Sequence, residues 1–263
     1  MAYIVSYPKS ETPAPTYENY IYNVGYCAFN TGYTHTSNTK IVFKAIIESW
    51  KSGGDWQNAF GALKGSYRDN SFVFWSRGDN TKFAFSRTGN FVQGDLVDAP
   101  ETSTSANWPF TPCIFTAEGQ VLSWYRESDP SIVRSLTSAG TVNGGVAPLA
   151  IFNINTATSD NGWSPSAGGT GFMKLFWFEI YESDVLLHRF VPAYNNSQYC
   201  LYDEVGETYI YDTINNGSTM RGYIAGVQIV PTLLMSMSNP PASEEEPESS
   251  EEVIPEEPTE GET

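Results

Sequence analysis

Two glutamates, Glu179 and Glu182, lie three residues apart in the aromatic segment FWFEIYESD at 176–184. Paired carboxylates can hydrolyse a glycosidic bond, and the retaining reaction needs the two carboxyl groups about 5–5.5 Å apart. In a regular strand, however, residues three apart point to opposite faces. A β-bulge could bring both to one face, but Tyr181, which is not an acid, lies between them. We therefore expect no catalytic residues here, and we expect that the protein is not an enzyme.

The remaining polar residues predict no metal ion and no cofactor. His35 lies in a polar turn and is expected to be solvated, while His188 lies in an apolar strand and is expected to bond locally. The residue spacing of zinc sites, phosphate-binding loops and nucleophile elbows is missing from the chain. Asp79-Asn80 and Asp160-Asn161 lack the spacing of a calcium-binding loop and are expected to shape turns.

A long polar loop suggests recognition of a sugar. The segment TATSDNGWSPSAGG at 156–169 presents Trp163 beside Asp160 and Asn161. An aromatic ring can pack on the C–H face of a pyranose while amides and carboxylates bond its hydroxyls. We therefore predict that these three residues contact a ligand. The alternative is that Trp163 folds back and closes the edge of the fold, because tryptophan is usually buried.

Two further aromatic residues are predicted ligand contacts. Trp56 lies in the segment KSGGDWQNAFG, which is expected to form a turn, and Tyr125 lies at the end of an expected strand. Trp75 and Trp124 lie within expected strands, and we place them in the core because most strand aromatics are buried there.

The elements that must position these residues are expected to be strands. Aromatic residues and glycine are abundant, with 16 Tyr, 15 Phe, 7 Trp and 22 Gly. Short aromatic and β-branched runs alternate with turn residues such as Asn143-Gly144-Gly145 and Asn215-Asn216-Gly217, a pattern typical of a β-sandwich or barrel. We expect strands at 41–49, 71–78, 82–89, 113–119, 120–128, 148–155, 171–183 and 185–194.

The strand at 171–183 is expected to be covered on both faces. Regular alternation places Phe176, Phe178 and Ile180 on one face. It places Leu175, Trp177, Glu179 and Tyr181 on the other. Both sets are largely apolar, as in a strand that is buried on both sides.

The chain divides by composition into an extended N-terminal arm at 1–17, a body at 18–230 and an acidic tail at 231–263. Within the tail, residues 243–263 carry ten glutamates and no Lys or Arg, so the tail is expected to be disordered. Removing those ten charges from the net −16 leaves −6 on residues 1–242. An acidic chain without a basic stripe argues against binding to nucleic acid.

The chain carries no recognisable secretion signal and no apolar run long enough to cross a membrane. Its three cysteines, Cys27, Cys113 and Cys200, are far apart and odd in number, so they are expected to be buried free thiols. We therefore expect folding in a reducing cytoplasm.

Two segments, at 26–47 and at 171–226, carry a series of ordered motifs, which in the second segment are Phe178-Glu179-Ile180-Tyr181, Arg189-Phe190-Val191-Pro192, Leu201-Tyr202-Asp203 and Ile224-Ala225-Gly226. These motifs resemble the LamG-like, concanavalin A-like jelly-roll domains of phage and prophage virion proteins, and the match spans about residues 20 to 229. One departure is Gln198-Tyr199-Cys200, where such domains place small residues and glycines.

This resemblance implies an all-β antiparallel sandwich of the concanavalin A-like jelly-roll type. With the missing secretion signal, it also implies a virion protein made in the host cytoplasm: a structural or adhesion protein of a tail, fibre or capsid surface. Expected partners are a host-surface glycan and, through the N-terminal arm, other virion proteins, in a homo-oligomer.

Two alternatives remain open. The first is a purely architectural virion subunit that binds no sugar. The second is a glycoside hydrolase, since laminarinase-type β-glucanases share this sandwich, although FWFEIYESD lacks their E-x-D-x-E or E-x-D-x-x-E motif.

Overall fold

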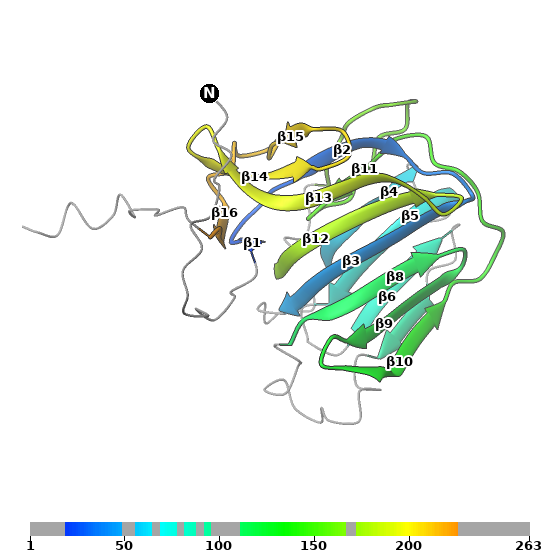
Figure 1. Cartoon of the computed structure of the whole chain (residues 1–263). Helices are drawn as coiled ribbons and strands as arrows, with labels where there is room; N and C mark the ends of the chain where they lie inside the picture. The colour runs from blue at the N-terminus through cyan, green and yellow to red at the C-terminus, as the bar shows by residue number, and fades with distance from the viewer. Residues whose placement is uncertain are drawn as a thin grey trace, which may run out of the picture. The chain divides into compact units, whose positions relative to one another are not determined.

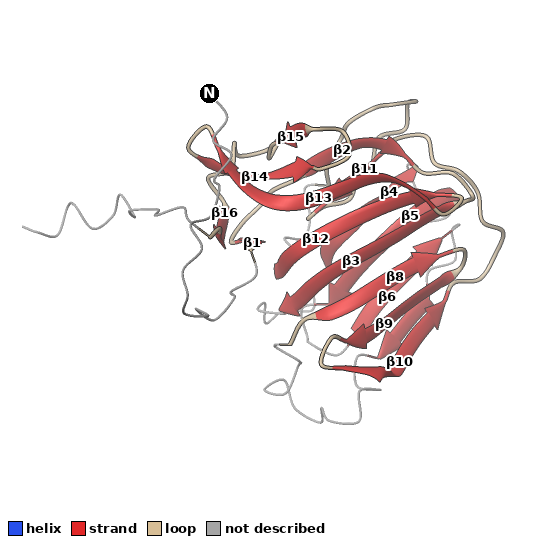
Figure 2. Cartoon of the chain, viewed as in Figure 1, coloured by secondary structure: helices blue, strands red, loops and turns tan. Residues whose placement is uncertain are grey.

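The protein is an antiparallel β-sandwich, as the sequence predicts (Figure 1). The computed structural model describes residues 19–48, 56–64, 69–77, 82–87, 92–95, 111–166 and 172–225, and Figure 2 shows strands and loops but no helix among them. The chain divides into two units, 1–227 and 228–263, and every described residue belongs to the first. The predicted arm at 1–17 and the acidic tail at 231–263 lie outside the described residues.

The larger sheet has ten strands and runs in the order β10-β9-β8-β3-β12-β13-β14-β15, with β1 beside β12 and β16 beside β1. Its strands are β1 (Tyr20–Asn23), β3 (Thr39–Glu48), β8 (Cys113–Glu118), β9 (Val121–Arg126), β10 (Asp129–Thr137), β12 (Phe172–Glu182), β13 (Val185–Asn195), β14 (Gln198–Asp203), β15 (Thr208–Ile210) and β16 (Met220–Tyr223).

The smaller sheet has six strands in the order β2-β11-β4-β5-β6-β7. These are β2 (Phe29–Thr34), β4 (Trp56–Lys64), β5 (Asp69–Arg77), β6 (Lys82–Arg87), β7 (Val92–Asp95) and β11 (Pro148–Ile151). The chain passes from one sheet to the other several times. In Figure 1 the strands β3, β12 and β13 lie in front of β4, β5 and β6.

Phenylalanine rings from both sheets fill the space between them. Phe43 of β3 stacks on Phe115 of β8, with ring centroids 4.7 Å apart, and lies 5.6 Å from Phe178 of β12 in the same sheet. Across the interior it meets Phe60 of β4 at 5.5 Å and Phe74 of β5 at 6.0 Å. All five side chains are fully buried or nearly so. Each such ring stabilises the fold by about 1.5–3 kcal/mol through removal of apolar surface from water.

A β-bulge in β12 changes which residues face the core. Leu175 pairs with Ala45 of β3, but Lys44, the next residue along β3, pairs with Trp177, so Phe176 is an extra residue. Leu175 and Phe178 are both fully buried, whereas Trp177 is partly exposed on the outer face of the sheet. The predicted alternation was therefore wrong at Leu175 and Phe176, and the outer face is not fully covered.

Three other local predictions were wrong. Trp56 does not lie in a turn, because it begins β4 and pairs with Arg77 of β5. Asn143-Gly144-Gly145 is not a hairpin turn, because it lies in the connection between β10 and β11, which belong to different sheets. His35 is not solvated, since its side chain is packed edge-on against Phe72.

Other predictions are confirmed. Trp75 is buried, and Trp124 packs against Phe115 at the edge of the core. Cys27, Cys113 and Cys200 are buried free thiols, and burial is the main cause that raises the pKa of each. None of the described residues forms a helix that is long and apolar enough to span a membrane.

We predict that Phe43→Ala lowers the free energy of unfolding by about 3–5 kcal/mol, because it removes the ring that contacts both sheets and leaves a cavity. Urea unfolding followed by tryptophan fluorescence measures the change. Val133→Ala is the matched control, because Val133 is 61% exposed and should change stability by less than about 0.5 kcal/mol. Equal midpoints for the two variants would contradict the central role of Phe43.

Candidate functional site

The outer face of the ten-stranded sheet carries a partly exposed tryptophan, Trp177, near its centre. The indole makes no contact with another aromatic ring among the described residues. Its neighbour across the bulge, Lys44, instead lies over Phe176, with Nζ 5.0 Å from the ring centroid, and pairs with Glu127 at 2.7 Å. One face of the indole is therefore a candidate platform for the apolar side of a ligand.

Trp177 belongs to a row of side chains that crosses the outer face. The pairing of adjacent strands places one member on each strand, and neighbouring strands are about 4.8 Å apart. Six of the seven members are partly exposed, and only Lys44 is buried. From β9 to β15 the members are Tyr125, Ile114, Lys44, Trp177, Val191, Tyr202 and Tyr209, where Val191 is reached by continuing the Phe178–Phe190 pair by one residue.

Polar groups stand beside the indole on the same face. Glu179, two residues from Trp177, accepts a hydrogen bond from the Tyr181 hydroxyl at 2.8 Å and lies 3.4 Å from Nη1 of Arg189 on β13. Burial first, and then this bond to a carboxylate, raises the pKa of Tyr181. A ring bordered by an ordered carboxylate and guanidinium can both stack on a sugar and bond its hydroxyls.

Glu182 points into the opposite side of the sheet. Its Oε2 accepts hydrogen bonds from the Tyr33 hydroxyl at 2.6 Å and from Thr39 at 3.2 Å, and its Oε1 accepts one from Thr36 at 2.6 Å. Partial burial raises the pKa of Glu182, but these three bonds and the charge of Arg87 outweigh it and hold the pKa below its ordinary value. The two glutamates of FWFEIYESD therefore do not share a cleft.

Arg87, at the end of β6, holds the same turn from inside the sandwich. Its Nη2 donates to the carbonyl oxygen of Thr36 at 2.6 Å, and its guanidinium lies 3.7 Å from the centre of the Phe72 ring. The side chain is fully buried, and burial lowers its pKa to about 10. Glu182 bonds the side chains of the β2–β3 turn while Arg87 bonds its backbone. We call these two residues the turn clamp.

His35 lies next to the turn clamp. The imidazole is 1% exposed, and neither ring nitrogen has a hydrogen-bond partner among the described residues. A side chain at Gly145 would collide with the ring, so that position must be glycine for the imidazole to fit. Burial, and then the charge of Arg87, lowers the pKa of His35 to about 3. The imidazole is therefore neutral at physiological pH.

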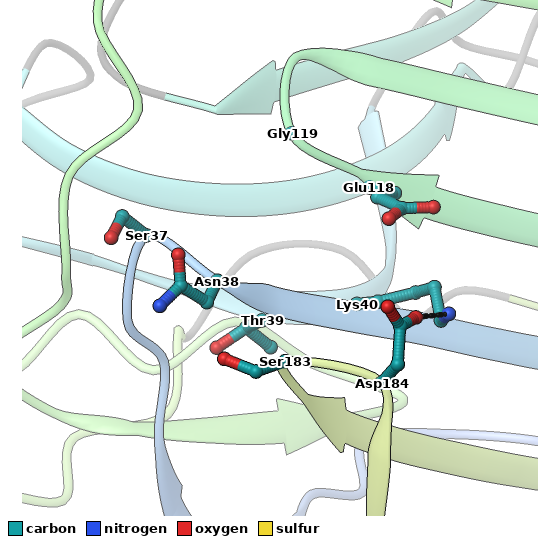
Figure 3. A pocket seen from close by; sticks show the side chains of 8 residues that line it. All are labelled: Ser37, Asn38, Thr39, Lys40, Glu118, Gly119, Ser183 and Asp184. Atoms are coloured by element: carbon teal, nitrogen blue, oxygen red, sulfur yellow. Dashed lines mark hydrogen bonds and ion pairs between the residues drawn. The ribbon is translucent and has the colours of Figure 1, made fainter.

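The turn clamp supports an open polar pocket of about 340 Å³ at this end of the larger sheet (Figure 3). Three turns meet there: the β2–β3 turn, the β8–β9 turn and the β12–β13 turn. The lining residues are Ser37, Asn38, Thr39, Lys40, Glu118, Gly119, Ser183 and Asp184. Lys40 also belongs to the outer face, because its Nζ lies 5.0 Å from the centre of the Tyr181 ring.

The predicted Trp163 loop is well anchored. Trp163 is partly buried, and its indole nitrogen donates to the Thr213 hydroxyl at 3.1 Å, which in turn donates to the carbonyl oxygen of Ala28. Asp160 and Asn161 are exposed in the same loop. The loop keeps these three residues together, but the indole N–H is already bonded within the protein. Their role as ligand contacts stays a prediction.

The other two predicted contacts lie elsewhere. Tyr125 is on the outer face of the larger sheet, in the same row as Trp177, whereas Trp56 is in the smaller sheet. The five predicted residues therefore do not form one site. Trp177 and Arg189 were missed because the strand was expected to be covered on both faces. Alternation along FWFEIY, which places Trp177 with Glu179 and Tyr181, was the signal that could have found Trp177; Arg189 lies on the neighbouring strand β13, which that pattern does not cover.

The described residues contain no group of three or more His, Cys, Asp or Glu side chains that could hold a metal ion. His188 bonds through Nδ1 to Asp203 at 2.7 Å, as expected of a locally satisfied ring. Asp203 also accepts from the backbone nitrogens of Arg189 and Val205, so it ties β13 to the turn after β14.

No family model matches the chain, and no curated protein matches its sequence. Among solved structures, it is similar to full-length tailspike protein 2 from the Escherichia coli O157:H7 bacteriophage CAB120, with 15% sequence identity and a TM-score of 0.35. The match covers 59% of this chain and 21% of the tailspike, so it spans about a fifth of that protein.

We predict that acid weakens the fold through His35. Because its pKa falls from 6.5 in the unfolded chain to about 3 in the fold, the folded state binds fewer protons in this range. Stability is then lost as the pH falls below about 6.5, by up to about 1.4 kcal/mol per pH unit. Urea unfolding at pH 7, 6 and 5 measures this slope.

The matched variant for this prediction is His35→Phe, which keeps an aromatic ring against Phe72 and removes the titrating group. The slope between pH 6.5 and 5 should largely disappear, whatever the variant's absolute stability. Glu182 and Asp203 have lowered pKa values, so their contributions are lost at more acidic pH. Equal slopes in the two proteins would show that folding does not lower the pKa of His35.

Proposed function

We propose that this protein is a phage virion structural and adhesion protein whose β-sandwich binds a host or mucosal glycan weakly. The virion setting is supported by the LamG-like sequence motifs at 26–47 and 171–226 and agrees with the all-β fold. In this proposal the arm at 1–17 attaches to other virion proteins, and the virion part is a homo-oligomer.

The glycan-binding half of the proposal is carried by one observation. Trp177 presents a partly exposed indole on the outer face of the larger sheet, beside the ordered pair of Glu179 and Arg189. The ring supplies an apolar surface for the C–H face of a pyranose, and the pair supplies an acceptor and donors for its hydroxyls. The Trp163 loop is the second place at which a glycan could bind.

A purely architectural subunit is the competing function, and the edge strand β10 favours it. Ile132 and Val133 are 47% and 61% exposed there, and the pairing of β10 with β9 is interrupted between Asp129 and Arg134. Exposed apolar residues on a sheet edge are suited to contact with another subunit.

A glycan array in low and moderate salt tests the proposal with the full chain, Trp177→Ala, Trp163→Ala and the control Tyr26→Ala. Tyr26 is 42% exposed and belongs to neither candidate site. We expect Trp177→Ala to weaken binding by at least about tenfold, or about 1.4 kcal/mol, and Tyr26→Ala to leave it unchanged. Loss only in Trp163→Ala would move the site to the loop. Absence of binding by every protein would support the architectural subunit.

A further inference from the structure

The pocket at the end of the larger sheet contains unused hydrogen-bonding groups. The hydroxyl groups of Thr36 and Thr39, on either side of the tip of the β2–β3 turn, donate hydrogen bonds to the carboxylate of Glu182. Between them, the side chains of Ser37 and Asn38 are exposed and have no hydrogen-bond partner among the described residues. In the part of the chain that the structure describes, the Ser183 hydroxyl and the Glu118 carboxylate also form no hydrogen bond.

The backbone beneath these groups is held in place. The turn clamp fixes the β2–β3 turn, and the backbone nitrogen of Ser183 donates to the carbonyl oxygen of Asn38 at 3.3 Å, which joins two of the three turns. Ser183 and Asp184 adopt φ values of 50° and 65°, the left-handed conformation that a two-residue hairpin turn between β12 and β13 requires at both positions.

The charges of the lining disfavour an anion. Lys40 forms an ion pair with Asp184, which is drawn as a dashed line in Figure 3. Because Lys40 and Asp184 offset each other, the carboxylate of Glu118 gives the lining a net charge of −1. A carboxylate or phosphate group on a ligand would be repelled, whereas uncharged hydroxyls can bond the serines, the amide and the carboxylate at once.

We propose that this pocket binds the uncharged terminal pyranose of the glycan, an inference that rests on the function proposed above. Its volume of about 340 Å³ lies at the small end of ligand sites, which span about 300–1,000 Å³. Ser37, Asn38 and Ser183 donate hydrogen bonds to sugar hydroxyls, and Glu118 accepts from one or two of them. Because the supporting backbone is already ordered, little conformational entropy is lost on binding.

The pocket also gives the glycan a direction. Lys40 lies over Tyr181, and Tyr181 lies four residues along β12 from Trp177, a distance of about 13 Å in a strand. A chain whose end occupies the pocket therefore continues over Tyr181 and Glu179 and reaches the indole after two or three sugar units. The protein recognises the end of an uncharged glycan and not its interior.

Amide chemical shifts of the full chain test the pocket directly. The probes are the methyl glycosides of glucose, galactose, mannose and N-acetylglucosamine at millimolar concentration, with glucuronic acid and N-acetylneuraminic acid as anionic probes. We expect at least one uncharged glycoside to shift the amides of residues 37–40, Gly119, Ser183 and Asp184. Ser37→Ala combined with Asn38→Ala should weaken that titration by about tenfold or more.

Ser128→Ala combined with Ser218→Ala is the matched control, because it removes two exposed polar side chains outside both the pocket and the Trp163 loop. The control should leave the titration unchanged. No shift with any uncharged glycoside, or equal binding of an anionic probe, would overturn the inference. Oligosaccharide binding that depends on Trp177 but not on Ser37 and Asn38 would overturn the pocket alone. If the pocket amides shift but the glycan array shows no binding, the role of Trp177 is overturned and the sugar-binding role of the pocket is kept.

Discussion

The contact of Phe43 with four other phenylalanine rings is the constraint on which the rest of the structure depends. It joins the two sheets through their central strands, and it fixes the faces of β3. Because side chains alternate along a strand, burial of Phe43 places Lys44 on the outer face, and burial of Phe178 does the same for Trp177 and Glu179. The chemistry of the outer face is therefore a consequence of how the interior packs.

The turn clamp plays the corresponding part at the end of the sandwich. A buried guanidinium is costly unless it is paired. Arg87 has a carbonyl oxygen, an aromatic face and the nearby charge of Glu182, while its Nε and Nη1 have no hydrogen-bond partner among the described residues. Arg87 and Glu182 together hold the polar β2–β3 turn in place, and the described residues contain no metal-binding group and no disulfide that could do so. Ser37 and Asn38 are left at its tip with their side chains directed to solvent.

Much of the fold could be predicted because its signals are local. Runs such as SFVFWSRG and VLLHRFVPAY combine strand-forming residues with adjacent turn residues, and both form strands. The strand β4 was missed because WQNAFGALK has no β-branched residue, and it is a strand because β5 and β11 pair with it. Local sequence cannot report such pairing, since it depends on residues far away in the chain.

The site could be predicted only in part, for the same reason. The burial of His35 depends on Phe72 and Gly145, which are distant in sequence. The bond that anchors Trp163 depends on Thr213. By contrast, the divergence of Glu179 and Glu182 follows from strand geometry alone, and the structure places the two carboxylates among different partners, as that geometry predicts.

The bulge at Phe176 has a consequence for how β12 tolerates changes in length. Lys44 stands opposite both Phe176 and Trp177, so the strand holds one residue more than its partner requires. Loss of Phe176 would turn this stretch into an ordinary strand, with Leu175 and Phe178 still inside and a single outward residue between them. Loss of any one residue between Phe178 and Glu182 would instead exchange the inner and outer residues on one side of the gap. Phe176 is thus the position at which the gene can lose one codon while the inward-facing and outward-facing residues of this strand keep their places.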